Sequence, residues 1–356
     1  MARVLNHELF SAKKTLRVSR PALAAAAAII LVAAVGANWD RLTKTDEDRF
    51  RESVAAGDFD AALEIAEAAA AKNPESADAH LKVASTYAQK ALRRQSVEES
   101  VAAARRFALR ASEIDAANPD AWRAVGYTYE LEGKLPLAID YYQKAIDASP
   151  KNAAALTQIG LALSAQGKTS AGERYLSLAV QADPLDPWAR IFLTRARLSQ
   201  ANPDAAAAEK ILEPVLVSGS QAAVAEAKAI VSGIRLAAGK PEEAELLARE
   251  AVAAAPDSVE ANIALGEALY DGVFSRQLPW EETFSEVRAI GDRLAELAPT
   301  RVAGPYLSLR AAARLGDKVS AAAYADRALG LVAQDPTLTA AERVDTQAKI
   351  RAAYSR

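Results

Sequence analysis

The 356-residue sequence contains no cysteine, only two histidines and few aromatic residues. Without cysteine, the chain can form no disulfide framework, no thiolate zinc site and no lipid-modified cysteine. The two histidines are His7 and His80, and neither has a second histidine near it in the sequence. A Ser-His-Asp triad and a di-histidine metal site are therefore implausible. We predict that the protein is not an enzyme and that it uses no metal and no cofactor.

Strong positive charge is also absent. The formal net charge is −3, whereas a general nucleic-acid-binding protein normally carries a basic face. The segment "GKTSAG" at 167–172 lacks the leading glycine and the spacing of a phosphate-binding loop. The sequence therefore predicts no nucleic-acid partner.

The N-terminus differs from the rest of the chain. Residues 1–20 carry five basic side chains against the single acid Glu8, and residues 21–39 carry no charge. This uncharged segment is close to the roughly twenty residues that span a bilayer, and a basic flank stays in the cytoplasm. We expect a cytoplasmic leader, a single transmembrane or signal segment at 21–39, and a periplasmic remainder. Cleavage near Ala37, which would release the chain into the periplasm, is an alternative, and an alanine-rich soluble helix is another.

A regular pattern of small residues, aromatics and prolines follows. Apolar residues make up 51% of the chain but aromatics only 6%, and an alanine-rich chain favours thin layers of closely packed helices. From Pro119 onward the pattern comprises Trp122, Val125, Gly126, Tyr129, Gly133, Ala138, Tyr142, Ala145 and Pro150. One period of about thirty-four residues later, the same slots hold Leu156, Ile159, Gly160, Leu163, Gly167, Gly172, Leu176, Ala179 and Pro184.

These slots have simple structural explanations. We expect Gly126 to lie where two antiparallel helices come closest, and Ala138 to be the small residue that faces it. Gly133 would form the turn between the helices, and Pro150 would end the second helix. His80 occupies the slot that Trp122 holds in the third repeat, so we interpret it as a packing residue.

The pattern resembles the tetratricopeptide repeat (TPR) family. The resemblance implies an all-α fold, a right-handed superhelical solenoid of antiparallel helix pairs. We divide residues 43–336 into about eight TPR-like helix pairs, at 43–76, 77–118, 119–152, 153–186, 187–224, 225–258, 259–301 and 302–336. We assign residues 337–356 to a C-terminal capping helix.

The resemblance also implies a concave groove lined by fixed positions of each first helix. The candidate groove residues in this sequence are Arg123, Tyr127, Glu130, Trp188, Ile191, Arg195, Glu267 and Tyr270. An insertion in the repeat at 259–301 is expected to form an enlarged turn or an extra half-turn of helix. Its segment 271–280, interpreted as a loop, adds Phe274 and Trp280 as candidates for partner binding. The alternative for each residue is an ordinary solvated or packed position.

We therefore predict a non-enzymatic protein–protein interaction scaffold of the bacterial cell envelope. It would assist assembly of a polysaccharide-export, pilus or secretion complex, with other proteins as its partners. A periplasmic recognition module that binds an extended peptide or glycan in the groove is the alternative. The Asn and Lys arrangement with which some family members clamp a C-terminal carboxylate is missing.

Overall fold

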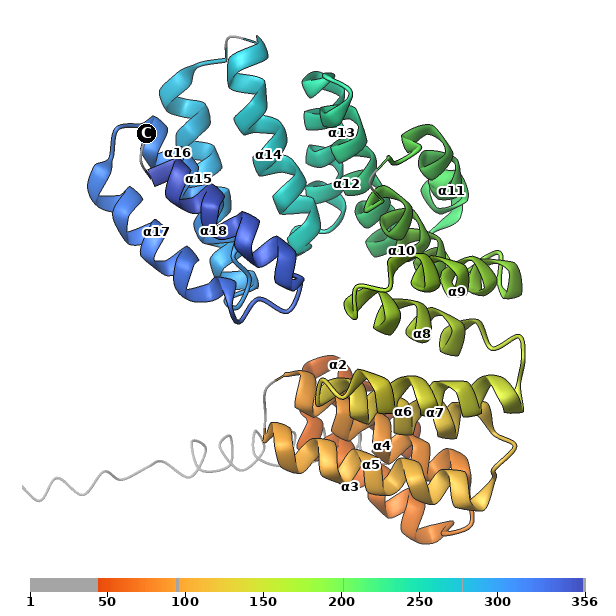
Figure 1. Cartoon of the computed structure of the whole chain (residues 1–356). Helices are drawn as coiled ribbons and strands as arrows, with labels where there is room; N and C mark the ends of the chain where they lie inside the picture. The colour runs from red at the N-terminus through yellow and green to blue at the C-terminus, as the bar shows by residue number, and fades with distance from the viewer. Residues whose placement is uncertain (1–43, 94–95, 201, 277, 355–356) are drawn as a thin grey trace, which may run out of the picture. The chain divides into compact units, whose positions relative to one another are not determined.

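The structure is a computed structural model that describes residues 44–93, 96–200, 202–276 and 278–354. These ranges contain seventeen α-helices, α2 to α18, and the prediction of an all-α, TPR-like solenoid is confirmed (Figure 1). The predicted leader at 1–20 and membrane segment at 21–39 lie outside the described residues. Within the described residues, no helix has both the length and the apolar character needed to cross a membrane.

The chain divides into two compact units, and the boundary follows Ala104. The first unit contains α2 (Asp46–Ala56), α3 (Phe59–Lys72), α4 (Ala77–Leu92) and the start of α5 (Val97–Ile114). The sequence predicts one uninterrupted array from residue 43. The boundary falls inside a helix, where no composition shift or turn residue could mark it.

The second unit begins at Arg105, includes the rest of α5 and continues as helix pairs. Its helices are α6 (Pro119–Leu131), α7 (Leu135–Ala148), α8 (Ala153–Ala165), α9 (Thr169–Ala182), α10 (Pro187–Leu198), α11 (Ala205–Ser218), α12 (Gln221–Ala237), α13 (Pro241–Ala254), α14 (Val259–Arg276), α15 (Trp280–Leu297), α16 (Ala303–Arg314), α17 (Lys318–Val332) and α18 (Ala340–Tyr354). The even-numbered helices from α6 to α16 are the first helices of their pairs. The last helix, α18, packs on α16 and α17 and fully buries Ile350.

Local sequence sets the start and end of α6. Pro119 occupies its first turn, and the side chain of Asn118 accepts a hydrogen bond from the backbone N–H of Asp120 at 2.9 Å. After α6 the chain turns at Gly133, whose φ of 72° lies in the left-handed region that favours glycine. This short turn brings α7 back against α6.

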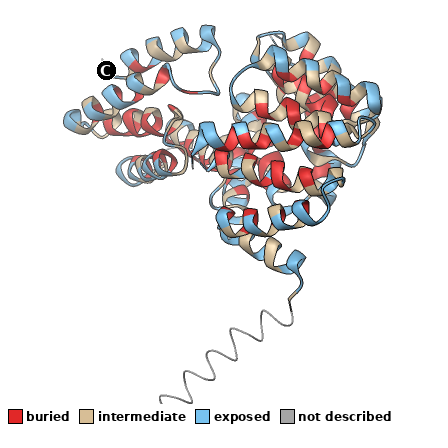
Figure 2. Ribbon diagram, turned by 90° about the horizontal axis from the view of Figure 1, so that it is seen from below, coloured by how far each residue is buried: buried red, intermediate tan, exposed pale blue. Residues whose placement is uncertain are grey.

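Small residues let the paired helices approach closely. A Cβ added to Gly126 would stand 2.5 Å from Cε1 of Tyr142 and 3.0 Å from the carbonyl oxygen of Ala138. Ala138, Tyr142 and Ala145 are fully buried, so the interior is a thin, alanine-rich layer. Figure 2 shows buried residues on the faces where helices meet and exposed residues on the outer faces.

Of the two forms predicted for the insertion around 271–280, an enlarged turn or extra helix, the structure has extra helix. Helix α14 continues to Arg276 and α15 begins at Trp280. Val273 and Phe284 are buried in one cluster with Leu269, so packing stabilises the extra helical residues. The insertion therefore mainly lengthens two helices.

Candidate functional site

Three connected cavities run along the first helices of the second unit. The cavity over α10, α12 and α14 has a volume of about 310 Å³, and one of about 200 Å³ lies mainly between α14, α16 and α18. The two share Ile263 and Glu267 as lining residues. A third, of about 420 Å³, shares Tyr306 and Lys349 with the second. We call this continuous surface the first-helix groove.

The floor of the groove over α12 and α14 is apolar. It is formed by Ala229, Ile230, Gly233, Leu236, Ile263 and Ala264. A Cβ added to Gly233 would meet no atom within 4 Å, so this position opens directly into the groove. We call this part of the groove the apolar trough.

Ion pairs border the apolar trough and tie neighbouring first helices together. Arg195 on α10 is hydrogen-bonded to Glu226 on α12 and lies 4.0 Å from the carboxylate of Glu260 on α14. Glu260 also pairs with Arg301 at 2.7 Å. Burial raises the pKa of Glu226, against the opposing effect of Arg195. The charged groups that border the trough are therefore largely held by partners on adjacent elements.

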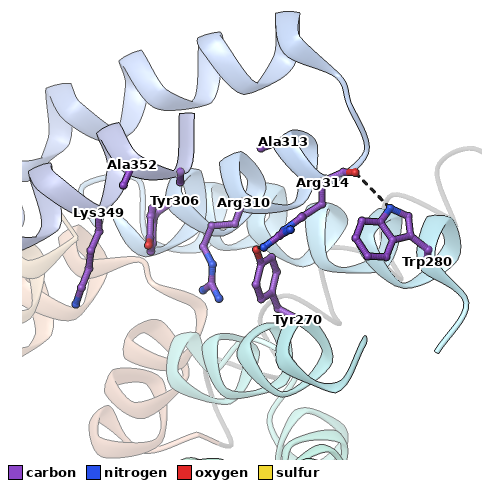
Figure 3. Close-up of a pocket in the computed structure, with 9 residues that line it drawn as sticks. Tyr270, Trp280, Tyr306, Arg310, Ala313, Arg314, Lys349 and Ala352 are labelled. Carbon is purple, nitrogen blue, oxygen red and sulfur yellow. Dashed lines mark hydrogen bonds between the residues drawn. The ribbon is translucent and has the colours of Figure 1, made fainter. Parts of the chain in front are cut away.

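The third cavity is lined by aromatic and basic side chains (Figure 3). We define the aromatic–arginine pocket by Tyr270, Trp280, Tyr306, Arg310, Arg314 and Lys349. The guanidinium carbon of Arg310 lies 3.8 Å from the ring centroid of Tyr270, and Nη1 of Arg310 donates to Glu267 at 2.6 Å. Burial alone would lower the pKa of Arg310. The charge of Glu267 and its hydrogen bond with Arg310 outweigh this effect, so the pKa of Arg310 is raised. The side chain of Arg310 is thus fixed by stacking and by a carboxylate.

Arg314 has a different environment. Its Nε donates to the hydroxyl of Tyr270 at 3.1 Å, and its guanidinium lies 4.8 Å from the ring centroid of Phe274. Its backbone carbonyl accepts a hydrogen bond from the indole N–H of Trp280 at 3.2 Å (Figure 3). Within the described residues, no carboxylate lies within 4.0 Å of the Arg314 guanidinium. The position of this cation is set by aromatic contacts, and no described residue neutralises its charge in an ion pair.

Aromatic side chains pack beside the pocket. The ring centroids of Trp280 and Phe284 are 4.8 Å apart, and those of Tyr270 and Phe284 are 5.3 Å apart. Phe284 is fully buried, whereas Phe274 and Trp280 remain 49% and 43% exposed. Glu267, Tyr270, Phe274 and Trp280, which the sequence singled out separately, therefore lie together. Each ring packs against its neighbours and is also exposed, and partner binding by Phe274 and Trp280 stays a prediction.

The candidates on α10 separate into different environments. Arg195 lines the groove, and Trp188 is 40% exposed, with its ring centroid 6.2 Å from that of Phe192. Ile191 is fully buried in a cluster with Leu212 and other side chains of α11 and α12. The expectation that Ile191 faces the groove is therefore wrong, because α11 and α12 cover it.

The candidates on α6 do not line the three cavities. Arg123 donates from Nε to Asp120 at 3.0 Å. Glu130 accepts a hydrogen bond from the Tyr142 hydroxyl, and burial raises the pKa of Glu130 despite this bond. Burial also raises the pKa of Tyr127. Glu130 thus has a partner within its own helix pair.

His80 is a packed side chain. It is 8% exposed, and its Nδ1 lies 2.9 Å from the carbonyl oxygen of Ser76. This environment agrees with the packing slot inferred from the sequence.

Comparison with known families decides the nature of these repeats. The family model described as tetratricopeptide repeat matches residues 48–108, 88–153 and 234–272. The segments 48–153 and 234–272 are therefore tetratricopeptide (TPR) repeats. TPR proteins form a scaffold family that is typically non-enzymatic and that binds proteins and peptides. No curated protein matches the sequence.

Solved structures share the fold of this TPR protein. A chain of the APC/C hetero-tetramer Cut9–Hcn1 is 15% identical with a TM-score of 0.55, and the match covers 74% of this chain and 48% of that one. Yeast Tom70 is 13% identical with a TM-score of 0.52, and the match covers 83% of this chain and 59% of that one. The match thus spans about half of the first structure and about three fifths of the second. At these identities the likeness shows the fold alone.

The residues predicted from the sequence do not include all those that line the groove. In the repeat at 225–258, the groove slots hold Glu226, Ala229, Gly233 and Leu236, of which the last three line the apolar trough. In the repeat at 302–336, the same slots hold Ala303, Tyr306, Arg310 and Ala313, and all four line the second or third cavity. The slot pattern could therefore have identified these residues. Arg314 and Lys349 lie outside the slots and required the structure.

Proposed function

We propose that this TPR protein is an interaction scaffold whose first-helix groove holds an extended segment of a partner protein. The protein is an interaction scaffold by family, and the observation that supports the location is the line of three joined cavities along α10 to α18. A linear groove fits an extended peptide better than a small compact ligand.

The chemistry of the groove favours a peptide over a glycan. Its apolar trough suits aliphatic side chains, and Tyr, Trp and Arg in the adjoining pocket are the residue types that dominate protein interfaces. Arg301 and Arg310 are held by Glu260 and Glu267. Because these ion pairs already exist, less side-chain entropy is lost when a partner binds.

The test is to fill the groove with a bulky side chain. Gly233 opens into the groove and Gly330 lies exposed on α17, and a Cβ at either position meets no atom within 4 Å. Partners captured from cells by the full chain should be lost at least ten-fold with Gly233→Trp and retained with Gly330→Trp. Quantitative mass spectrometry of both variants checks this. Equal recovery with both variants would remove the groove from consideration.

We also propose that the protein is anchored in the inner membrane by residues 21–39 and that its repeats lie in the periplasm. The support is the uncharged segment behind a basic leader. The partner would then belong to an envelope assembly such as a polysaccharide-export, pilus or secretion complex. A reporter that is active only outside the cytoplasm, fused after Asp40, should be active. A cytoplasm-specific reporter that is active at the same junction would contradict the proposal.

A further inference from the structure

The lining of the aromatic–arginine pocket is positively charged. Its walls carry Arg310 and Arg314 from α16 and Lys349 from α18, and none of the described residues that line it is acidic. Arg310 is balanced by Glu267, and Lys349 contacts Asp345 on its own helix at 2.6 Å. Only Arg314, among these three cations, has no carboxylate within ion-pair distance in the described part of the chain.

The position of Arg314 suits it to bind an anion from a partner. Its Nε–H donates a hydrogen bond to the Tyr270 hydroxyl, and one face of its guanidinium lies against Phe274. These contacts fix the side chain and leave other guanidinium N–H groups without a carboxylate acceptor among the described residues. A charge-assisted hydrogen bond to a carboxylate would satisfy them.

We propose that the partner segment is acidic where it meets the aromatic–arginine pocket and apolar where it crosses the apolar trough. This inference rests on the proposed function and adds the chemistry of the bound segment. The carboxylate of an Asp or Glu side chain binds Arg314. Aliphatic side chains of the same segment lie over Gly233 and Ile263.

The geometry also sets the spacing between the two parts of the partner segment. The trough lies over α12 and α14, and the pocket lies around α16. Neighbouring packed helices are about 9 Å apart, so the two sites are separated by about 15–20 Å. An extended chain rises about 3.3 Å per residue, so this separation corresponds to about five residues.

Acidic side chains fit the pocket better than a single chain terminus. Arg310 and Arg314 lie on α16, whereas Lys349 lies on α18 (Figure 3). Cations on two different helices can contact more than one carboxylate. A segment with two neighbouring acids can therefore bind Arg314 with one acid and approach Lys349 with the other, which one terminal carboxylate cannot do.

The test is a selection with displayed peptides. A library of random twelve-residue segments, each flanked on both sides so that no free terminus is offered, is selected on the purified full chain. Enriched peptides should contain Asp or Glu about four to six residues from Leu, Ile or Val, as the geometry requires. Synthetic amidated copies are then titrated by fluorescence anisotropy.

Variants separate the possible outcomes. Arg314→Gln and an Asp→Asn or Glu→Gln change in the peptide should each weaken binding at least ten-fold, and the two losses should not add. The Lys349 side chain is 60% exposed, so Lys349→Gln should not affect folding. This change should weaken binding about three-fold, as expected of a partly solvated charge. Arg293→Gln is the matched control, because Arg293 pairs with Asp257 at 2.7 Å and does not line the groove.

Each negative result has a distinct meaning. Peptides that lack acids, or that bind Arg314→Gln and Lys349→Gln as tightly as the unmodified chain, would overturn this inference alone, provided that Gly233→Trp still abolishes their binding. If no peptide is enriched, or if Gly233→Trp has no effect on the enriched peptides, the proposed function fails and this inference fails with it.

Discussion

Gly126 and Gly233 both lie inside first helices, yet their surroundings are opposite. A Cβ on Gly126 would overlap Tyr142, which is fully buried, whereas a Cβ on Gly233 would enter open space. Glycine inside a helix costs about 0.5–1 kcal/mol relative to alanine. At Gly126 close packing accounts for the glycine. At Gly233 no packing contact requires a glycine. A glycine on the floor of the groove would let the backbone of a partner approach closely.

Alanine substitutions at these glycines should have opposite effects on stability. Gly126→Ala should lower the free energy of unfolding by about 1–3 kcal/mol, because Tyr142 and α7 have to move. Gly233→Ala should raise it by about 0.5–1 kcal/mol, and Gly330→Ala is a control for the same gain on α17. Urea unfolding followed by circular dichroism measures all three. Stabilisation by Gly126→Ala would contradict the packing described for α6 and α7.

Glu130 should make stability depend on pH. Burial raises its pKa above the ordinary 4.5 and the hydrogen bond from Tyr142 only partly opposes this, so the folded state binds more protons than the unfolded state above pH 4.5. The contribution of Glu130 to stability is therefore greatest at low pH and falls as pH rises through the raised pKa.

The variant Glu130→Gln removes this titration and keeps an acceptor for the Tyr142 hydroxyl. The stability of the unmodified chain relative to this variant should decrease as the pH rises above about 4.5, the ordinary pKa of the group. Urea unfolding of both proteins at several pH values measures the difference. A difference that is constant or that grows with pH would show that burial does not control this carboxyl group.

At the scale of elements, the lengthened α14 and α15 depend on packing beyond the repeat pattern. Val273, near the end of α14, and Phe284, near the start of α15, are buried in one core cluster. Phe284 also contacts the exposed rings of Trp280 and Phe274. The two helix ends that border the aromatic–arginine pocket are thus held by one buried aromatic side chain.

Phe284→Ala should therefore destabilise these helices locally. Loss of a fully buried phenylalanine lowers the free energy of unfolding by about 3–5 kcal/mol, and in a repeat array each repeat is stabilised by its neighbours. Amide hydrogen exchange should become faster in α14, α15 and α16 and remain nearly unchanged in α6 and α7. Uniform acceleration through the second unit would contradict nearest-neighbour stability.

The sequence predicted those features that depend on local spacing. Gly126 and Gly133 were assigned correctly, because close approach and a left-handed turn each demand glycine. Ile191 shares its register with Arg195, which does line the groove, but packing against side chains of α11 and α12 buries Ile191. Arg314 was not predicted, because its environment depends on contacts with α14 and α15 that are distant in sequence.

At the scale of the whole molecule, one surface of the second unit combines the features that a partner would meet. The described helices α10 to α18 place an apolar trough and a cationic, aromatic pocket in one continuous groove. The ion pair between Arg301 and Glu260 and that between Arg310 and Glu267 hold elements around the groove together. The central claim is that a partner segment lies along this surface rather than on the second helices.

Site-specific photocrosslinking in cells tests this claim most directly. A benzophenone amino acid replaces Trp280, a 43% exposed aromatic side chain that lines the groove, or Gly330, on α17. At Trp280 it takes the place of a ring that is already present, and at Gly330 a Cβ meets no atom within 4 Å. We predict a discrete crosslinked partner from Trp280 and none from Gly330. Crosslinking from Gly330 alone, or equally from both positions, would contradict the claim.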